Sequence, residues 1–326
     1  MSVIDSDSIL GVDFGALNTR IALFDVVDGQ YRFVAAASSP TTAAPPYLDV
    51  SEGLRRALEQ LKQTTGRAFV DDNDNLILPS HDDGSGVDAL VATASAGPPL
   101  RAVLVGLMPD VSLESARHLA ASNYINIVDQ IGLHDRRRDD QRIDAILAAR
   151  PDLILIAGGT ENGAHEAVVR LTETVGLACH LLPPNRRPQI LYAGNSQASA
   201  KVLEQLQPHA RKIRAVRNLR PTLEAEDLAP ARAALSEMFD ELRVGQAYGF
   251  AELARWSKTP LVPTARAFGQ IIGYYSRVYD PGKGVLGVDV GAGSTTVAAA
   301  FEGQLYLTVR PDLGLGEPLM RVLDHT

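Results

Sequence analysis

The chain has 326 residues, of which 45% are apolar, 21% charged and 6% aromatic, a composition typical of a globular protein with room for about two domains. A net charge of −8 and a single cysteine exclude a disulfide framework, a multi-cysteine metal cluster and a chain that binds polyanions over its whole surface. The N-terminus has two early aspartates and no basic region, and no apolar run reaches about 18 residues. We therefore expect no signal peptide, no membrane contact and a cytoplasmic location.

Three short apolar runs near the N-terminus predict strands over Ile9–Phe14, Arg20–Asp25 and Tyr31–Ala37. The connections between them are too short for a parallel crossover, so the strands should pair as antiparallel hairpins. An amphipathic helix is predicted from Ser51, its expected N-cap, to Thr64. The aspartate-rich stretch 71–88 is predicted to be a solvated loop.

From Arg101 onward, short apolar runs alternate with helical patterns, which indicates βαβ units around a parallel sheet covered on both faces. The predicted strands are Ala102–Leu107, Ile125–Asp129, Leu153–Ala157, Ala178–Leu182, Gln189–Ala193 and Lys212–Val216. The predicted helices are Leu113–Ala121, Asp140–Ala149, Ala164–Val175 and Gln197–Leu206. Residues 221–279 are expected to be mostly helical with a break at 258–263, and Gly284–Ala300 with Gln304–Arg310 predict a second hairpin region.

Two segments share one pattern, Gly11–Thr19 and Gly287–Thr296: an apolar strand, Asp-x-Gly, a turn of small residues, then hydroxyl or amide side chains. Glycine lets backbone N–H groups approach an anion, and a carboxylate at a strand end can hold Mg²⁺ through water. The candidate phosphate contacts are Gly15, Asn18, Thr19, Gly291, Gly293, Ser294, Thr295 and Thr296, and the candidate metal ligands are Asp13 and Asp289. The alternative for each hairpin alone is an ordinary β-turn. Two copies favour a phosphate clamp.

These hairpins resemble those of the actin/Hsp70/sugar-kinase ATPase superfamily. Four further motifs, Ala94–Gly97, Leu100–Leu107, Pro151–Gly163 and Ile190–Asn195, resemble the glutamate mutase L family, reactivating chaperones of adenosylcobalamin-dependent mutases, and the likeness covers almost the whole chain. One departure is Arg20, where relatives usually have lysine; it keeps the charge but not the ammonium geometry.

The resemblance implies an α/β, actin-like (ribonuclease H-like) fold with an inserted Rossmann-like parallel region. The implied parts are a first subdomain over 1–84, a partner-binding insertion over 85–220, a helical connection over 221–283 and the start of a second subdomain over 284–326. It also implies ATP and Mg²⁺ as cofactors, catalytic roles for Asp13 and Asp289, and a cobalamin-dependent mutase as partner. The superfamily's adenosine motif normally follows the second hairpin at a distance that this sequence does not reach, so the second subdomain is expected to be incomplete.

Three functional hypotheses stay open: an ATP-dependent mutase reactivase, a small-molecule kinase, and a truncated interaction module without nucleotide turnover. A kinase needs a catalytic base to accept the proton of the substrate hydroxyl. No motif marks such a base in the sequence, and Asp110 and Asp129 are the two aspartates considered for the role. ATP hydrolysis and oligomeric state are left open. If Asp13 and Asp289 are unpaired acids facing one cleft, replacing either by Asn should leave the ligand-free protein as stable or more stable.

Other motifs carry weaker predictions. The Ala157–Thr160 and Gly194–Ser196 loops follow strands and are either tight turns or ligand sites at a carboxyl edge. Arg136–Arg138 is followed by two aspartates, and Arg211–Arg220 lacks aromatic residues for base stacking, so we expect no nucleic-acid partner. Cys179 lies in an apolar stretch and should be buried and unreactive.

Overall fold

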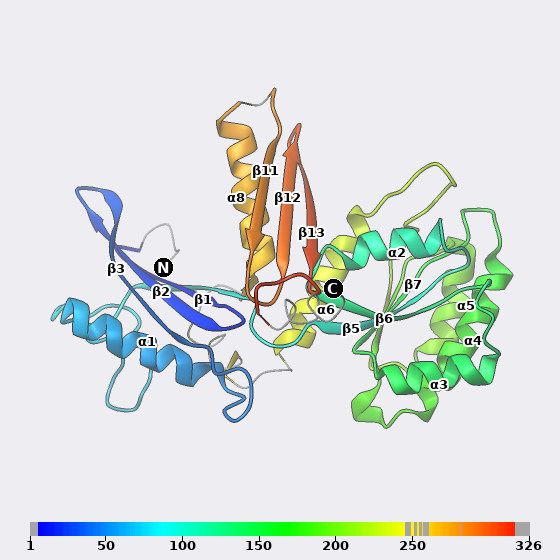
Figure 1. Cartoon of the computed structure of the whole chain (residues 1–326), viewed down its shortest axis with the longest axis horizontal. Coiled ribbons are helices and arrows are strands. Elements are labelled where there is room, and N and C mark those ends of the chain that lie inside the picture. Colours follow the sequence, from blue (N-terminus) through cyan, green and yellow to red (C-terminus); the bar gives the residue numbers. More distant parts are fainter. Residues whose placement is uncertain are drawn as a thin grey trace. The chain divides into compact units, whose positions relative to one another are not determined.

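The computed structural model describes residues 6–244, 249–250, 253, 256, 261–280 and 282–316 (Figure 1). Two compact units divide the chain: Met1–Pro98 together with Arg243–Thr326 form the first unit, and Pro99–Leu242 form the second. The second unit is therefore inserted into the first. Within the described part of the chain, no helix combines the length and hydropathy that crossing a membrane requires.

The first unit is built on a five-stranded mixed sheet with the order β10-β4-β1-β2-β3. Its strands are β1 (Ser8–Phe14), β2 (Asn18–Val27), β3 (Gln30–Pro40), β4 (Ala89–Ala94) and β10 (Val262–Pro263). Strands β1, β2 and β3 pair antiparallel, whereas β4 is parallel to β1 and β10 is parallel to β4. The three predicted antiparallel strands are confirmed, and they continue into a mixed sheet.

Helix α1 (Val50–Thr65) covers one face of this sheet, because its apolar positions match the alternating buried positions of β1. Leu10, Val12 and Phe14 share a buried cluster with Leu54 of the helix. The predicted N-cap is wrong by two residues: the Asp49 side chain accepts a hydrogen bond from the backbone N–H of Ser51 at 2.9 Å. A carboxylate there also suits the positive end of the helix dipole.

Strand β4 is absent from the sequence-based expectations, which place Ala89–Ala94 inside the insertion. Its residues are mostly small, but β1 offers a parallel partner with the register Leu10–Leu90 through Phe14–Ala94. Long-range pairing therefore makes a strand of a segment with little local signal. The boundary between the compact units falls at Pro98, not near residue 85.

A second, three-stranded antiparallel sheet of the first unit has the order β11-β12-β13. Its strands are β11 (Val285–Val290), β12 (Thr295–Phe301) and β13 (Gln304–Arg310). Helix α8 (Thr264–Val278) lies along one face of this sheet (Figure 1). Ile272 of the helix packs on Ala298 and Ala300 in a small core, so this region confirms the predicted second hairpin region.

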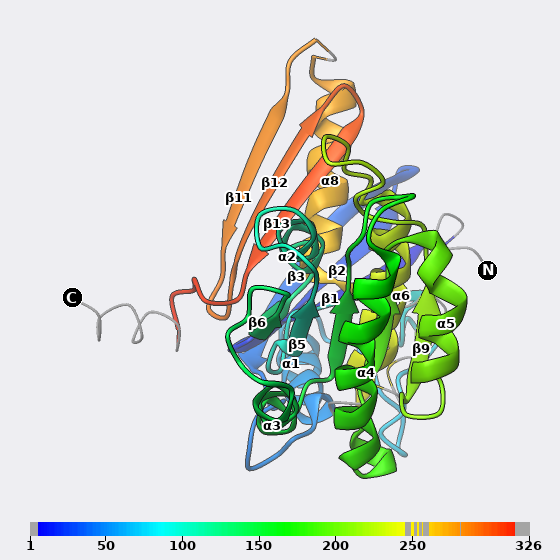
Figure 2. The same ribbon diagram turned by 90° about the vertical axis from the view of Figure 1, so that its right-hand side faces the viewer.

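The second unit is a five-stranded, fully parallel sheet with the order β6-β5-β7-β8-β9. The strands are β5 (Leu100–Val105), β6 (Ile125–Ile131), β7 (Leu153–Ile156), β8 (Gln189–Tyr192) and β9 (Lys212–Ala215). Helices α2 (Ser112–Ala120) and α6 (Ala229–Val244) share a core with one face. The other face of the sheet shares a core with three helices that lie in a row (Figure 2): α3 (Asp139–Ala149), α4 (His165–Leu181) and α5 (Ser196–Leu206). A 3-10 turn, η2 (Pro184–Arg186), precedes β8. This is the predicted doubly covered parallel sheet.

The predicted strand Ala178–Leu182 is wrong, because residues 178–181 are the last part of α4. The buried positions Val168, Val175 and Cys179 continue at helical spacing, and period rather than apolar content decides between helix and strand. Gly176 does not end the helix, and a Cβ there would stand 3.4 Å from the Leu206 side chain, an ordinary contact distance, so the packing of α5 does not require glycine at this position.

The Cys179 thiol is fully buried, as predicted, and burial raises its pKa to about 12. The reactive thiolate is therefore scarce at neutral pH as well as inaccessible. We expect a bulky disulfide reagent at about pH 8 to label the native protein far more slowly than the same protein in denaturant. Equal labelling rates in the two states would show that this part of the core is not formed as described.

Candidate functional site

The two Asp-x-Gly hairpins have the same backbone geometry. In the first, Asp13 pairs with Arg20 across the strands, and in the second Asp289 pairs with Thr296. The first turn is closed by the Gly15 N–H donating to the Asn18 carbonyl at 3.0 Å. The second is closed in the same way, from Gly291 to the Ser294 carbonyl at 2.9 Å. The repeat in the sequence is thus a repeat in structure.

Glycine is required most clearly in the first turn. A Cβ on Gly15 would stand 2.7 Å from the Asn18 carbonyl oxygen, closer than any real Cβ contact allows. At Gly291 the corresponding distance to the Ser294 carbonyl oxygen is 3.2 Å, which is tight but less severe. Both turns therefore present backbone rather than side chain at this position, as an anion-binding turn needs.

The Asp13 carboxylate is held on one of its two oxygens. The Thr93 hydroxyl, on the neighbouring strand β4, donates to Asp13 Oδ1 at 2.7 Å, and the Thr264 hydroxyl, on the first residue of α8, donates to the same oxygen at 2.9 Å. The other oxygen, Oδ2, lies 3.9 Å from where a Cβ on Gly15 would stand, so it is next to the turn. Asp13 is thus not the unpaired acid that the sequence suggests.

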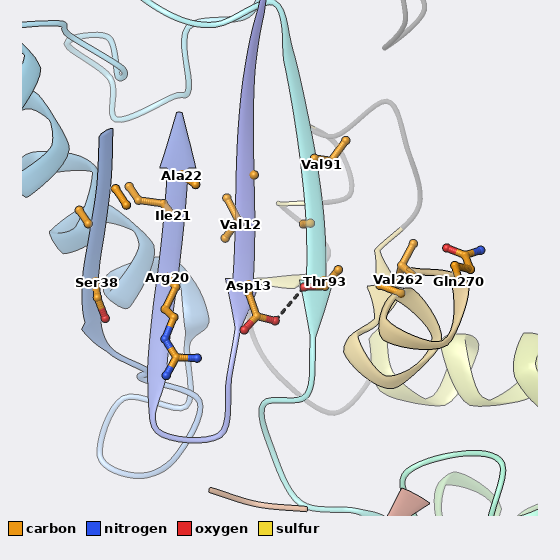
Figure 3. Close-up of a pocket in the computed structure, with 15 residues that line it drawn as sticks. Val12, Asp13, Arg20, Ile21, Ala22, Ser38, Val91, Thr93, Val262 and Gln270 are labelled. Atoms are coloured by element: carbon orange, nitrogen blue, oxygen red, sulfur yellow. Dashed lines mark hydrogen bonds between the residues drawn. The ribbon is translucent and has the colours of Figure 1, made fainter. Parts of the chain in front are cut away.

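A pocket of about 870 Å³ lies beside Asp13, on the face of the five-stranded sheet opposite α1 (Figure 3). Its floor is made of small residues on neighbouring strands, and Arg20 and Asp13 lie near one another on this face. Val262 and Gln270 stand on the α8 side. The floor residues are Gly11, Ala22, Ala36, Ala37 and Ser38. The arrangement leaves room for a ligand next to one carboxylate and one guanidinium.

Two of the predicted phosphate-binding hydroxyls are turned into the protein. Thr19 is fully buried and its hydroxyl is 3.1 Å from that of Thr41, while Thr296 is 4% exposed. Asn18 and Asp289 are exposed, and the remaining predicted residues of the second turn, Gly291, Gly293, Ser294 and Thr295, are half-buried. The exposed surface of both hairpins is therefore mainly turn backbone, with fewer hydroxyls than the sequence suggests.

Helix α8 meets both hairpins. Its first residue, Thr264, binds Asp13, and a Cβ on Gly287 of β11 would overlap the side chains of Phe268 and Ile272. Asp289 is two residues after Gly287 in β11, so the two residues lie on the same face of the three-stranded sheet. The sequence gives no signal for Thr93 or Thr264, because neither stands in a recognisable motif.

In the second unit, the Gly-Gly loop after β7 is Ala157–Thr160. The space where a ligand could bind beside this loop is occupied by side chains of the protein itself. Glu161 accepts hydrogen bonds from the Ser196 backbone N–H at 3.2 Å and from the Asn218 side chain at 2.9 Å, so a carboxylate already occupies the N-terminus of α5. Burial by itself would raise the pKa of Glu161, but the hydrogen bonds from Ser196 and Asn218 outweigh it and hold the pKa below its usual value. This geometry favours a tight structural turn over a phosphate site.

Replacing Glu161 by Gln should destabilise the protein at pH 7 by about 1.5–3 kcal/mol, the usual value of a hydrogen bond to a charged group. Since the folded-state pKa is lowered, this contribution is present above the ordinary carboxyl pKa and is lost as the pH falls toward the lowered value. Urea unfolding of wild type and variant should therefore differ at pH 7, and the difference should shrink as the pH falls below about 4, the ordinary range of a glutamate carboxyl. Glu166→Gln, at an exposed position of the next helix, is the control, and a pH-independent difference would contradict the assignment.

The basic clusters are largely neutralised by acids, the first by acids nearby in sequence and the second mainly by acids of a distant helix. Arg137 binds Asp129 at 2.6 Å and Asp135 at 2.7 Å. Within Arg211–Arg220, Lys212 and Arg214 both bind Glu241 of α6. The positive charge of this stretch is therefore smaller than its sequence indicates.

A mixed sheet that starts with three antiparallel strands, two equivalent Asp-x-Gly hairpins and an inserted parallel α/β unit together define an actin-like ATPase fold. A family model described as "MutL protein" matches residues 9–316, and the chain belongs to this family, the glutamate mutase L family that its motifs resemble. Protein MutL of Clostridium tetanomorphum is 24% identical in an alignment of 322 residues that covers 97% of this chain and 62% of that protein. The chain thus spans less than two thirds of the length of this curated relative.

Two solved structures show weak likeness. The Aquifex aeolicus member of the Ppx/GppA family has a TM-score of 0.22 and 9% identity, covering 95% of this chain and 52% of that one. A glycerol dehydratase reactivase has a TM-score of 0.27 and 11% identity, covering 93% and 72%. At these TM-scores neither likeness adds to the fold assignment, which rests on the strand order.

Proposed function

We propose that this chain binds Mg-ATP at its two hairpins and couples ATP binding or hydrolysis to the reactivation of a cobalamin-dependent mutase in the cytoplasm. The observation that carries the proposal is the repeated hairpin: two turns of the same length, register and closing hydrogen bond, each preceded by an aspartate. Ordinary β-turns have no reason to share all these features. Membership of the MutL family supports the choice of partner.

The residues around Asp13 fit an ion that keeps most of its water. Mg²⁺ is usually held by one or two carboxylates together with phosphate oxygens and several waters. Asp13 offers Oδ2 beside the turn while Oδ1 is held by two hydroxyls, and Arg20 on the same sheet face supplies a positive charge for phosphate. Asp289 would act from the second hairpin, where its exposed side chain can meet a hydrated ion. Bound Mg²⁺ would supply charge neutralisation of the phosphates.

The inserted unit, Pro99–Leu242, is the proposed partner-binding part. It has its own parallel sheet and its own hydrophobic cores, so it can move as a rigid body without losing its fold. Ligand-driven closure of the ATP-binding unit would then alter what the insertion offers to a mutase.

Thermal melts test the nucleotide site. Mg-ATP should raise the melting temperature of wild type, and Asp13→Asn and Asp289→Asn should each reduce this shift because each removes a charge that helps to hold the metal. Without ligand, Asp13→Asn should cost about 1 kcal/mol, since it weakens two hydrogen bonds to a charged acceptor. Asp289→Asn should be nearly neutral because the side chain is exposed.

The control is Asp28→Asn, in the turn between β2 and β3, where a positive φ of 53° suits asparagine equally well. It should leave both the melting temperature and the ATP-induced shift unchanged. No shift for wild type, or equal shifts for all four proteins, would overturn the nucleotide assignment.

An activity assay on a mutase that has been inactivated during turnover tests the coupling between ATP and reactivation. Adding this protein with Mg-ATP and fresh cofactor should restore mutase activity, whereas adding it without ATP, or as Asp13→Asn, should restore much less. Recovery that is independent of ATP would instead favour an interaction module. For the kinase alternative, one of the two candidate bases, Asp129, is ion-paired with Arg137, which argues against a free base at that position.

A further inference from the structure

We infer that Thr93 and Thr264 are positioning residues for Asp13, and that Thr264 makes helix α8 the link between the two hairpins. The inference rests on the proposed function, because it concerns how the same site holds its metal. Both hydroxyls donate to a single oxygen, at 2.7 and 2.9 Å, and this leaves the second oxygen next to the turn.

The two donors are fixed independently of the carboxylate. Thr93 lies directly opposite Asp13 in the β1–β4 pairing. Thr264 follows Val262 and Pro263, which pair in parallel with Thr93 and Ala94. Backbone pairing therefore sets the place of both hydroxyls, and the carboxylate has to orient toward them.

Fixing Oδ1 selects one rotation of the carboxylate and so fixes where Oδ2 points. Groups that orient a metal ligand in this way typically change metal affinity by about 10–100-fold when they are removed. A purely structural tie between β1, β4 and α8 would require the two hydrogen bonds but would give no dependence on the metal. This difference separates the two explanations.

Thr264 also connects this oxygen to the second hairpin. It is the first residue of α8, and one turn and two turns later Phe268 and Ile272 pack against β11 at Gly287. A change at Asp13 that moves Thr264 therefore moves the helix on which the second hairpin rests. The link needs no contact between the hairpins themselves.

The test is titration calorimetry of the full chain with ATP, once in excess Mg²⁺ and once in EDTA. Thr264→Val removes the donor while keeping the shape, and it should weaken Mg-ATP binding by about 10–100-fold while leaving metal-free ATP binding unchanged. Thr264→Ser keeps the hydroxyl and should restore wild-type affinity. Thr93→Val should behave like Thr264→Val and gives a second route if one variant fails to fold.

Thr64→Val, an exposed threonine near the end of α1, is the matched control and should bind like wild type. Wild-type Mg-ATP affinity in both valine variants, or an equal loss with and without Mg²⁺, would overturn the positioning role and leave the proposed function standing. If wild type itself shows no Mg²⁺-dependent ATP binding, the proposed function fails and the inference fails with it.

Discussion

A single carboxylate oxygen, Asp13 Oδ1, is where three segments far apart in the sequence meet. It belongs to β1, and its two hydrogen-bond donors come from β4 and from the start of α8. The whole second unit is inserted between those two donors, since the chain leaves after β4 and returns at β10, which pairs with β4 itself. An insertion is tolerated when its ends are close together. Here the ends are also tied by Arg243, whose guanidinium donates to the carbonyls of Ala96 at 2.6 Å and Pro98 at 2.7 Å.

Local patterns predict most of the elements, and they fail where a distant partner decides the outcome. The period-2 alternation of β1 and the apolar runs of the parallel sheet are local, so their strands were predictable. Strand β4 exists because β1 pairs with it. Likewise, nothing near Lys212 shows that Glu241 will neutralise it, because the two meet only when α6 packs against the sheet. The error at Ala178–Leu181 is of another kind, because the helical period of the buried positions in α4 was itself a local signal.

The residues of the candidate site also separate into those that local sequence patterns can predict and those that they cannot. The aspartates and turn glycines could be found from the repeated motif, because a turn is a local structure. The inward direction of Thr19 follows from register: it pairs with Phe14 across the hairpin and so shares the buried face of that residue. Thr93 and Thr264 had no such signal. A hydroxyl that matters only because of the carboxylate opposite it is visible only once the sheet is assembled.

The two hairpins have equivalent backbones, but different groups surround their aspartates. Asp13 has Arg20 across the strand and two hydroxyls on one oxygen, so its orientation is set before any ligand arrives. Asp289 has Thr296 across the strand, is exposed, and lies on a sheet whose place is set by α8. In the proposed ATP site, the first hairpin would be the fixed half of the clamp and the second the half that α8 positions. In such an arrangement the helix, rather than the second hairpin's own side chains, determines how well the two halves act on one ligand.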